Sequence, residues 1–311
     1  MSDTTYEALW RRILVYAPEC PIPLAQEFIQ TAYSRATAYY PWSQLKVEAE
    51  FRIPTAYSTG TANVTEGSVS VIGVGTTWTS AMVNRQFMTE GNAPIYTVAS
   101  FTDATHITLD RPYEKDTNPS VAYTISVVYV EVPSDFLRFD VVRDLSNNWK
   151  LRTNFTQGQL DIWDAKRAFA GTSWIVANAP PRLVSGGVPV VRYELWPRPL
   201  PASKTYAYRF IKRPPLLSAA SDRAFYPLRG DTIRKGAMSE LAMWPGTASL
   251  KNSFYNLDQH RTLEQEFQLS LAEAWREDNE ISQTAVQYDV SDEWQYAPID
   301  AAFWQSHDVG F

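Results

Sequence analysis

Residues 67–79 have the sequence Gly67-Ser-Val-Ser-Val-Ile-Gly-Val-Gly-Thr-Thr-Trp-Thr79, in which apolar and polar side chains alternate around Val69 and Val71. Alternation with a period of two is typical of a β-strand that buries one face. Similar alternation occurs at residues 95–99 and 107–109, and the turn-forming sequence Glu90-Gly91-Asn92 precedes the first of them. Short strands separated by turns predict a small β-sandwich or barrel over residues 58–127.

The chain before this segment has a different pattern. Residues 3–17 and 24–40 carry apolar side chains three or four positions apart, which predicts two helices. Asp3, Thr4 or Thr5 is expected to cap the first helix, and Pro18 and Pro41 are expected to end the two. After Trp42 the pattern becomes extended.

The chain after the segment mixes strands and helices. Residues 189–196 and 205–211 are predicted strands, and the proline-rich linker 197–201 predicts that they form a β-hairpin. Two helices are then expected over residues 231–244 and about 253–283. Asp231 or Thr232 is expected to cap the first of these. Because helical segments lie on both sides of it, the β segment is interpreted as an insertion.

These patterns together predict an α+β protein. It would have a helical bundle core, an inserted small β-sandwich or barrel domain, a β-hairpin and an extended C-terminal tail. The predicted parts are the N-terminal helical part of the core (1–57), the inserted β domain (58–127), the remainder of the core with the hairpin and two C-terminal helices (128–283), and the tail (284–311).

Composition excludes several classes of protein. Hydrophobic residues make up 45% and charged residues 20% of the 311 residues, which is a globular profile. The net charge of −6 provides no basic footprint for reading a DNA sequence. The single cysteine, Cys20, can build neither a disulfide framework nor a zinc site, which fits a reducing cytoplasm. The N-terminal residues lack the basic and apolar regions of a secretory signal and no apolar run reaches about 18 residues, so we expect neither secretion nor a membrane partner.

The sequence lacks the motifs of common enzymes. It contains neither a phosphate-binding GxxxxGK[ST] loop nor a GxSxG nucleophile motif. The histidines at 106, 260 and 307 are isolated, and acidic pairs such as Glu277-Asp278 are adjacent rather than opposed across a cleft. We therefore expect no catalytic residues, no metal site, no cofactor and no enzymatic activity.

Aromatic residues make up 14% of the chain, with 11 tryptophans and 17 tyrosines. Such residues are enriched where proteins meet proteins. The C-terminal tail is especially aromatic and has neither a helical nor a strand period. We therefore predict that it docks on a partner through Trp294, Tyr296, Phe303, Trp304 and Phe311.

Three segments resemble the ring-forming head-to-tail adaptors of tailed bacteriophages, the connector or neck proteins similar to tail tubular protein A. The first is the helical pair that begins at Tyr6-Glu-Ala-Leu-Trp10 and continues at Ala25-Gln-Glu-Phe-Ile29. The second is the β segment quoted above, which is similar to a module found in many phage structural proteins. The third is Gly230-Asp-Thr-Ile-Arg-Lys-Gly-Ala-Met-Ser-Glu-Leu-Ala-Met-Trp-Pro-Gly246 with the helix that follows.

The resemblance implies a structural virion protein of the neck, assembled in the host cytoplasm. It implies a helical bundle core and a cyclic homo-oligomer, with 12 copies in the family, that binds the portal protein and a tail nozzle or tail-tube protein. It also implies a channel through which DNA passes without sequence-specific contacts. Family members are often shorter, so the β insertion is a departure, and tail fibres are one partner that it could contact.

An acidic or neutral channel would let DNA slide, because like charges repel. Our first candidates for channel-facing side chains are Glu264, Glu266, Glu273 and Glu277 on the last helix.

A second hypothesis is a receptor- or glycan-binding virion protein that acts through the β insertion. Trp78, Tyr96 and Tyr113 could stack on sugars, or they could equally fill the core of a small sandwich. A tail-associated peptidoglycan hydrolase is a third and weaker hypothesis.

Overall fold

The structure of the protein is a computed structural model, and it describes residues 5–91, 93–183, 189–199, 203–247 and 250–283. These residues form two compact units. Among the described residues, one unit contains residues 5–47 together with residues 211–283, and the other contains Glu48–Phe210.

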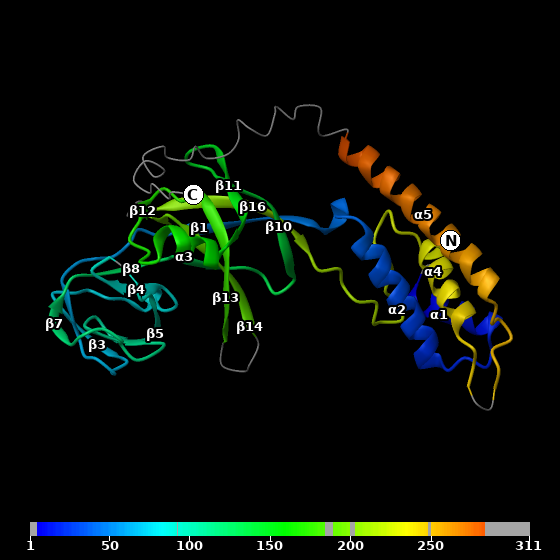
Figure 1. The fold of residues 1–311 in the computed structure, drawn as a ribbon, viewed down its shortest axis with the longest axis horizontal. Helices are drawn as coiled ribbons and strands as arrows, with labels where there is room; N and C mark the ends of the chain where they lie inside the picture. The colour runs from blue at the N-terminus through cyan, green and yellow to red at the C-terminus, as the bar shows by residue number, and fades with distance from the viewer. Residues whose placement is uncertain (1–4, 92, 184–188, 200–202, 248–249, 284–311) are drawn as a thin grey trace. The chain divides into compact units, whose positions relative to one another are not determined.

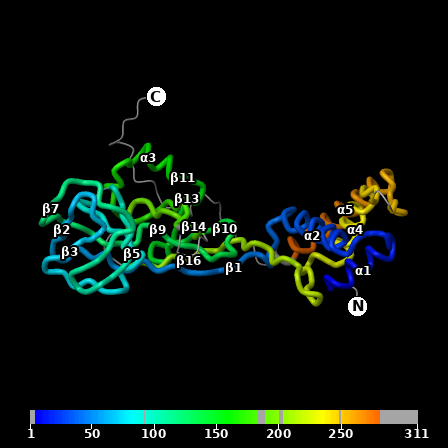
Figure 2. Tube along the Cα trace, turned by 90° about the horizontal axis from the view of Figure 1, so that it is seen from below, coloured from blue at the N-terminus to red at the C-terminus, as the bar shows by residue number. Residues whose placement is uncertain are grey.

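The first sheet of the larger unit contains the β insertion. Its seven strands follow the spatial order β7-β2-β3-β6-β5-β4-β8, and they curl around a shared core (Figures 1 and 2). Trp78, Phe87 and Tyr123 lie in that core, where the rings of Phe87 and Tyr123 stack at 5.5 Å. The strands are β2 (Thr61–Val64), β3 (Ser70–Val74), β4 (Gln86–Thr89), β5 (Tyr96–Asp103), β6 (His106–Leu109), β7 (Asn118–Val121) and β8 (Tyr123–Ser126), with the 3-10 helix η2 (Ser80–Met82) between β3 and β4.

The alternating pattern of the sequence sets the register of this sheet. Strand β3 has buried and exposed residues in strict alternation, with Val71 and Gly73 facing inward. Its neighbour β2 pairs with it in antiparallel register, Ala62 opposite Gly73 and Val64 opposite Val71. The predicted small β-sandwich or barrel therefore corresponds to strands β2–β8.

The second sheet of this unit was not anticipated as a single structure. It has the order β1-β16-β10-β11-β13-β14-β9, which joins strands from before and after the insertion. A short pair, β12 (Ala170–Gly171) and β15 (Arg198–Pro199), and helix α3 (Gln157–Asp164) accompany it. The sheet strands are β1 (Lys46–Ile53), β9 (Tyr129–Glu131), β10 (Phe136–Asp144), β11 (Trp149–Thr156), β13 (Ile175–Leu183), β14 (Pro189–Trp196) and β16 (Lys204–Lys212).

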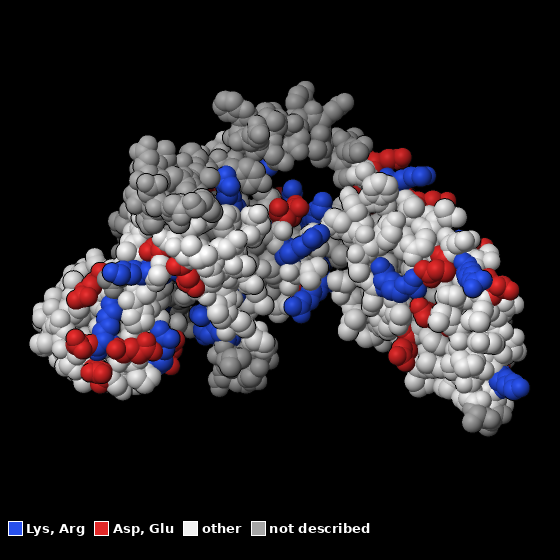
Figure 3. Space-filling view, in the orientation of Figure 1, with Lys and Arg blue, Asp and Glu red and all other residues white. Residues whose placement is uncertain are grey.

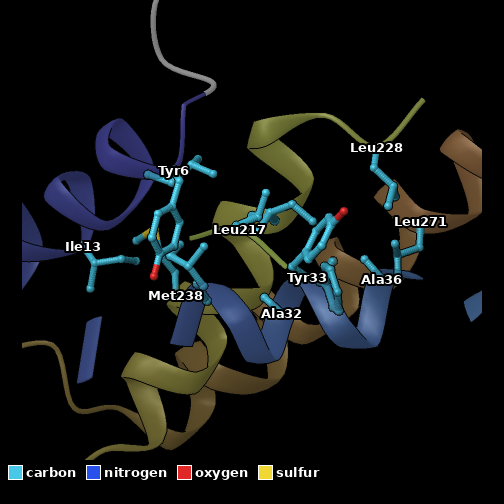
Figure 4. Packing of buried hydrophobic residues seen from close by; sticks show 14 of the residues in the cluster. Tyr6, Ile13, Ala32, Tyr33, Ala36, Leu217, Leu228, Met238 and Leu271 are labelled. Carbon is cyan, nitrogen blue, oxygen red and sulfur yellow. The ribbon is translucent and has the colours of Figure 1, made fainter. Parts of the chain in front are cut away.

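The smaller unit consists of helices α1 (Tyr6–Tyr16), α2 (Ile22–Tyr39), α4 (Gly230–Met243) and α5 (Leu257–Gln283), with the 3-10 helix η1 (Ser43–Leu45). They pack around one core, and Figure 4 shows Ala36 of α2 and Leu271 of α5 turned toward the same interior. Helices α2, α4 and α5 approach one another closely at Gly236. A Cβ atom there would lie 2.9 Å from the Phe267 ring and 3.0 Å from Ala32 Cβ, so no larger residue fits without a shift.

The predicted fold class is wrong. Among the described residues the chain is mostly β, with 16 strands, of which 14 form two large curled sheets, and five α-helices. The helices of the smaller unit do not provide a helical bundle core for the chain, because the strands on both sides of the insertion build a sheet with a core of its own. Trp174, Ile175 and Trp196 belong to that core.

The predicted hairpin is also wrong. Strand β14 pairs with β13 and β9, whereas β16 lies between β1 and β10. The linker between β14 and β16 does not turn back tightly, since Arg198 and Pro199 pair instead with Ala170 and Gly171. Hydrogen bonding to distant strands overrides the proximity of the two strands in sequence.

The helix caps follow the sequence in one case and depart from it in another. Thr5 caps α1 and accepts a hydrogen bond from the Ala8 backbone N–H at 3.3 Å, as one of the predicted options requires. Helix α4 begins one residue earlier than expected and has no side-chain cap. Asp231 lies in its first turn and pairs with Arg234, and Thr232 is buried. The prediction that either residue caps this helix is therefore wrong.

None of the helices in the described part of the chain is both long enough and apolar enough to cross a membrane.

Candidate docking surface

One end of the helical unit is held together by polar contacts among four chain segments. Asn252, in the loop between α4 and α5, donates hydrogen bonds to the carbonyl groups of Leu241 and Trp244 at 2.8 and 2.7 Å. Glu19, between α1 and α2, accepts a hydrogen bond from the Ser253 backbone N–H at 2.5 Å. That hydrogen bond holds the pKa of the Glu19 carboxyl below its ordinary value. The end of α1, the start of α2, the end of α4 and the start of α5 therefore meet here.

The same end exposes an unusual set of apolar side chains. Val15 is 75% exposed, Leu250 is 56% exposed and Leu257 is 53% exposed, and the exposed Tyr16 ring contacts the Phe254 ring at 5.7 Å. We call this set the apolar end, and it consists of Val15, Tyr16, Ile22, Met243, Leu250, Tyr255 and Leu257. Around the loop between α4 and α5, at the lower right of Figure 3, mostly uncharged atoms are visible. Grouped exposed apolar side chains mark surfaces that bind other molecules.

A second exposed set lies elsewhere on the same unit, where α2 ends, α4 begins and α5 approaches its last described residues. Tyr39 is 46% exposed, Tyr226 is 50% exposed and Trp275 is 37% exposed, and the Trp275 ring contacts Tyr40 at 6.0 Å. We call Tyr39, Tyr226 and Trp275 the aromatic end. Because tyrosine and tryptophan combine a large apolar face with a polar atom, they suit a protein interface.

Two of the four predicted channel-facing glutamates, Glu264 and Glu277, form hydrogen bonds and ion pairs with other residues of the helical unit. Glu264 accepts hydrogen bonds from Arg35 and, at 3.1 Å, from Ser239, and it thereby links α5 to α2 and α4. Burial opposes the ionisation of Glu264, but hydrogen bonds from Gln268 and Arg35 outweigh it, so the pKa of this carboxyl lies below its ordinary value. Glu277 accepts a hydrogen bond from the Tyr226 hydroxyl, which lowers the pKa of its carboxyl, and it also pairs with Arg229 at 3.1 Å.

Glu266 and Glu273 are exposed on α5, where they are available to an external partner. Their position in a channel stays a prediction. The predicted docking residues Trp294, Tyr296, Phe303, Trp304 and Phe311 lie outside the described residues.

The three aromatic residues of the glycan-binding hypothesis are buried in the first sheet. Trp78 is 2% exposed, Tyr96 is 0% exposed and Tyr113 is 3% exposed. Their polar atoms are paired internally, since the Trp78 indole donates to Tyr123 Oη at 2.9 Å and Tyr113 Oη lies 3.1 Å from Thr89 Oγ1. These side chains fill the sandwich core and offer no ring face to a sugar.

Within the described ranges, no group of three or more histidine, cysteine, aspartate or glutamate residues could hold a metal ion. His106 lies 3.0 Å from Asp103, and His260 contacts Ser239 at 2.9 Å. Each of these two histidine rings therefore has a hydrogen-bonding partner within its own unit.

No match to this sequence was found among protein-family models or among curated proteins.

The apolar end was not predicted because its members come from four separate segments. Each residue is unremarkable in the sequence. Leu257, for example, counts among the apolar positions of its helix and would ordinarily be assigned to the core. Only the packing of the four helices leaves these residues on the surface.

Proposed function

We propose that this protein is a structural, non-enzymatic assembly protein whose helical unit docks on a neighbouring copy of the same chain. The observation that carries this proposal is the apolar end, where seven exposed large hydrophobic side chains come from the four chain segments that meet there. Burying one such aliphatic side chain fully contributes about 1.5–3 kcal/mol. Several of them on one surface provide enough driving force for association.

The aromatic end supports a particular symmetry. A ring is made from one heterologous interface, repeated until it closes, so each subunit needs two different surfaces. The apolar end and the aromatic end are two such surfaces on one unit, and they differ in composition. An arrangement in which each copy places its apolar end on the aromatic end of the next copy satisfies this requirement.

The resemblance of three sequence segments to phage adaptors supports a specific role for the ring. In that role the protein joins the portal of the capsid to the tail nozzle or tail tube, in the neck of a virion, and lets DNA pass. The β insertion of strands β2–β8 is then available to a further partner such as a tail fibre. The C-terminal tail would grip the portal or the next ring through its aromatic residues.

The proposal is tested by native mass spectrometry and negative-stain microscopy of the full chain, alone and mixed with the portal protein of the same phage. We expect a ring of one stoichiometry, formed either by the protein alone or only on the portal. A protein that stays monomeric at all concentrations and ignores the portal would overturn the proposal.

A paired set of variants locates the interface. The double variant V15E/L257E places two charges on the apolar end, whereas I162E places one on α3 of the larger unit, where Ile162 is 77% exposed. We expect V15E/L257E to remain folded by circular dichroism yet fail to form the ring, and I162E to form it normally. A ring that survives V15E/L257E would exclude the apolar end as the interface.

A further inference from the structure

A pocket of about 270 Å³ lies within the larger unit, between the start of β4 in the first sheet and strands β9, β13 and β14 of the second. Gln86 holds these two walls together. Its side-chain oxygen accepts hydrogen bonds from the backbone N–H groups of Val128 at 2.8 Å and Tyr129 at 3.2 Å. The Gln86 amide nitrogen in turn donates to the Asn84 carbonyl at 3.0 Å. The walls are therefore built in advance of any ligand.

Three arginines line this pocket, together with one carboxylate. Arg182 is paired with that carboxylate, Glu131, through its Nε at 2.8 Å. Arg192 lies over the Tyr129 ring at 4.3 Å, and its Nε donates to the Pro180 carbonyl at 2.7 Å. These contacts fix both guanidinium groups while leaving the terminal amino groups of Arg192 without a hydrogen bond to any described residue.

Arg85 differs from its two neighbours. It is half-buried, and among the residues that the structure describes its guanidinium has no ion pair and no hydrogen bond. Burial lowers the pKa of this guanidinium below its ordinary value. A half-buried cation without a counter-charge is costly for the protein to maintain unless something outside the chain pairs with it.

Arg167, elsewhere in the same unit, is a buried arginine with a structural role. Burial opposes its charge, but Glu194 and Asp161, each 2.5 Å from the guanidinium, outweigh burial and hold the pKa above its ordinary value. Arg167 is thus fully paired from within the chain, whereas Arg85 is not. Arg85 therefore lacks the internal counter-charges that Arg167 has, and its guanidinium is available to an external anion.

We propose that this arginine pocket, formed by Arg85, Arg182 and Arg192, binds a phosphate group. Three guanidinium groups against one carboxylate leave a formal charge of +2, in a protein whose net charge is −6. A phosphate monoester carries about −1.5 to −2 at neutral pH and presents oxygens that match the planar fork of arginine. The pocket volume of about 270 Å³ leaves room for a phosphate group.

This proposal does not depend on ring formation, and its test uses the full chain at low ionic strength. Isothermal titration calorimetry is performed with inorganic phosphate in one arm and with a ten-residue oligothymidylate in the other. We expect saturable binding in at least one arm, weakened tenfold or more in R85Q. The control R143Q removes an arginine whose 3.6 Å ion pair with Glu48 lies at the surface, and it should bind as the wild type does.

Thermal unfolding separates a binding role of Arg85 from a structural one. Without phosphate, R85Q should be at least as stable as the wild type, because it removes a half-buried charge that has no counter-charge among the described residues. With phosphate, the wild type should gain melting temperature and R85Q should not. Binding of phosphate alone assigns the site to free phosphate or a phosphomonoester, and tighter binding of the oligonucleotide assigns it to a phosphodiester. Absence of saturable binding in both arms, or equal binding by R85Q, would overturn the proposal.

Discussion

Replacing Glu194 by glutamine is expected to destabilise the second sheet, because Glu194 is the internal counter-charge of Arg167. The two side chains are 1% and 7% exposed, and Arg167 Nε lies 2.5 Å from Glu194 Oε1. The other carboxylate oxygen accepts a hydrogen bond from Gln157 Nε2 at 2.7 Å. In E194Q the new amide would lose the negative charge and would also turn an NH₂ group toward either Arg167 or Gln157, both of which are donors.

The expected loss in the free energy of unfolding depends on which partners Arg167 keeps after the substitution. Removing one partner of a buried ion pair costs about 3–5 kcal/mol. Asp161 still pairs with Arg167 at 2.5 Å, but the Asp161 side chain is 61% exposed, so solvent screens that pair. We therefore expect the lower end of the range, about 3 kcal/mol, which shifts the folding equilibrium of this unit roughly a hundredfold.

The assay is urea denaturation read by hydrogen exchange of peptides from β13 and β14, because the two units can unfold separately. The double variant R167M/E194L removes both charges and is expected to be closer to the wild type than E194Q, since apolar pairs often replace buried ion pairs without loss. A change in E194Q of less than about 0.5 kcal/mol, the range of ordinary surface substitutions, would refute this reasoning.

Three further outcomes are expected. Phe267 is fully buried against α2 and α4, so F267A should destabilise the helical unit by about 3–5 kcal/mol in a circular dichroism melt, whereas L269A on the same helix, at a 65% exposed position, should change it little. Burial raises the pKa of the Cys20 thiol to about 11, so at pH 8 the folded protein should react slowly with a thiol reagent and the urea-unfolded protein quickly; equal rates would contradict this. Hydrogen bonds from His106 and Thr105 lower the pKa of Asp103 to about 2, so its stabilising contribution should be complete above the unfolded pKa of about 3.9 and be lost as pH falls toward 2; a carboxyl that titrates near 3.9 by NMR would argue against it.

Local structure was largely predictable where neighbouring residues decide it. Thr5 caps α1, and Pro18 and Pro41 follow α1 and α2 closely, because a hydroxyl acceptor and a missing N–H act within one turn of a helix. Strand β3 alternates between buried and exposed positions because the period of two is a property of the strand itself, but its exposed positions include the apolar residues Ile72 and Val74.

The fold class was not predictable in the same way. Strands β11 and β13 were not identified, yet they form the middle of the second sheet and pair with each other in parallel. Strand β14 was identified but was assigned the wrong partner, since Tyr193 pairs with Asn178 of β13 and Val130 of β9 rather than with the next strand in sequence. Pairing between distant strands depends on the packing of whole sheets, and no local pattern encodes it.

For the candidate sites, too, the sequence identified single residues but not which residues would lie together. The sequence indicated an aromatic tail and four acidic residues on the last helix. It did not indicate that Glu264 would form an ion pair with Arg35. The sequence also did not indicate that Val15 and Leu250 would belong to the same surface. Nor did it indicate that Arg85 and Arg192, which are 107 positions apart, would line the same pocket. Exposure and proximity are properties of the assembled units.

The sequence by itself determined the helix boundaries near prolines, the alternating strands of the β insertion and the net charge of −6. These depend on backbone geometry, side-chain spacing and composition, which act over a few residues or over the whole chain without regard to fold. Only the tertiary structure decided that strands from both sides of the insertion share one sheet, that apolar residues gather at one end of the helical unit, and that Arg85 lies half-buried without a described counter-charge. Those outcomes follow from long-range packing, because the apolar face of each sheet or helix is buried against another element that can be distant in the sequence.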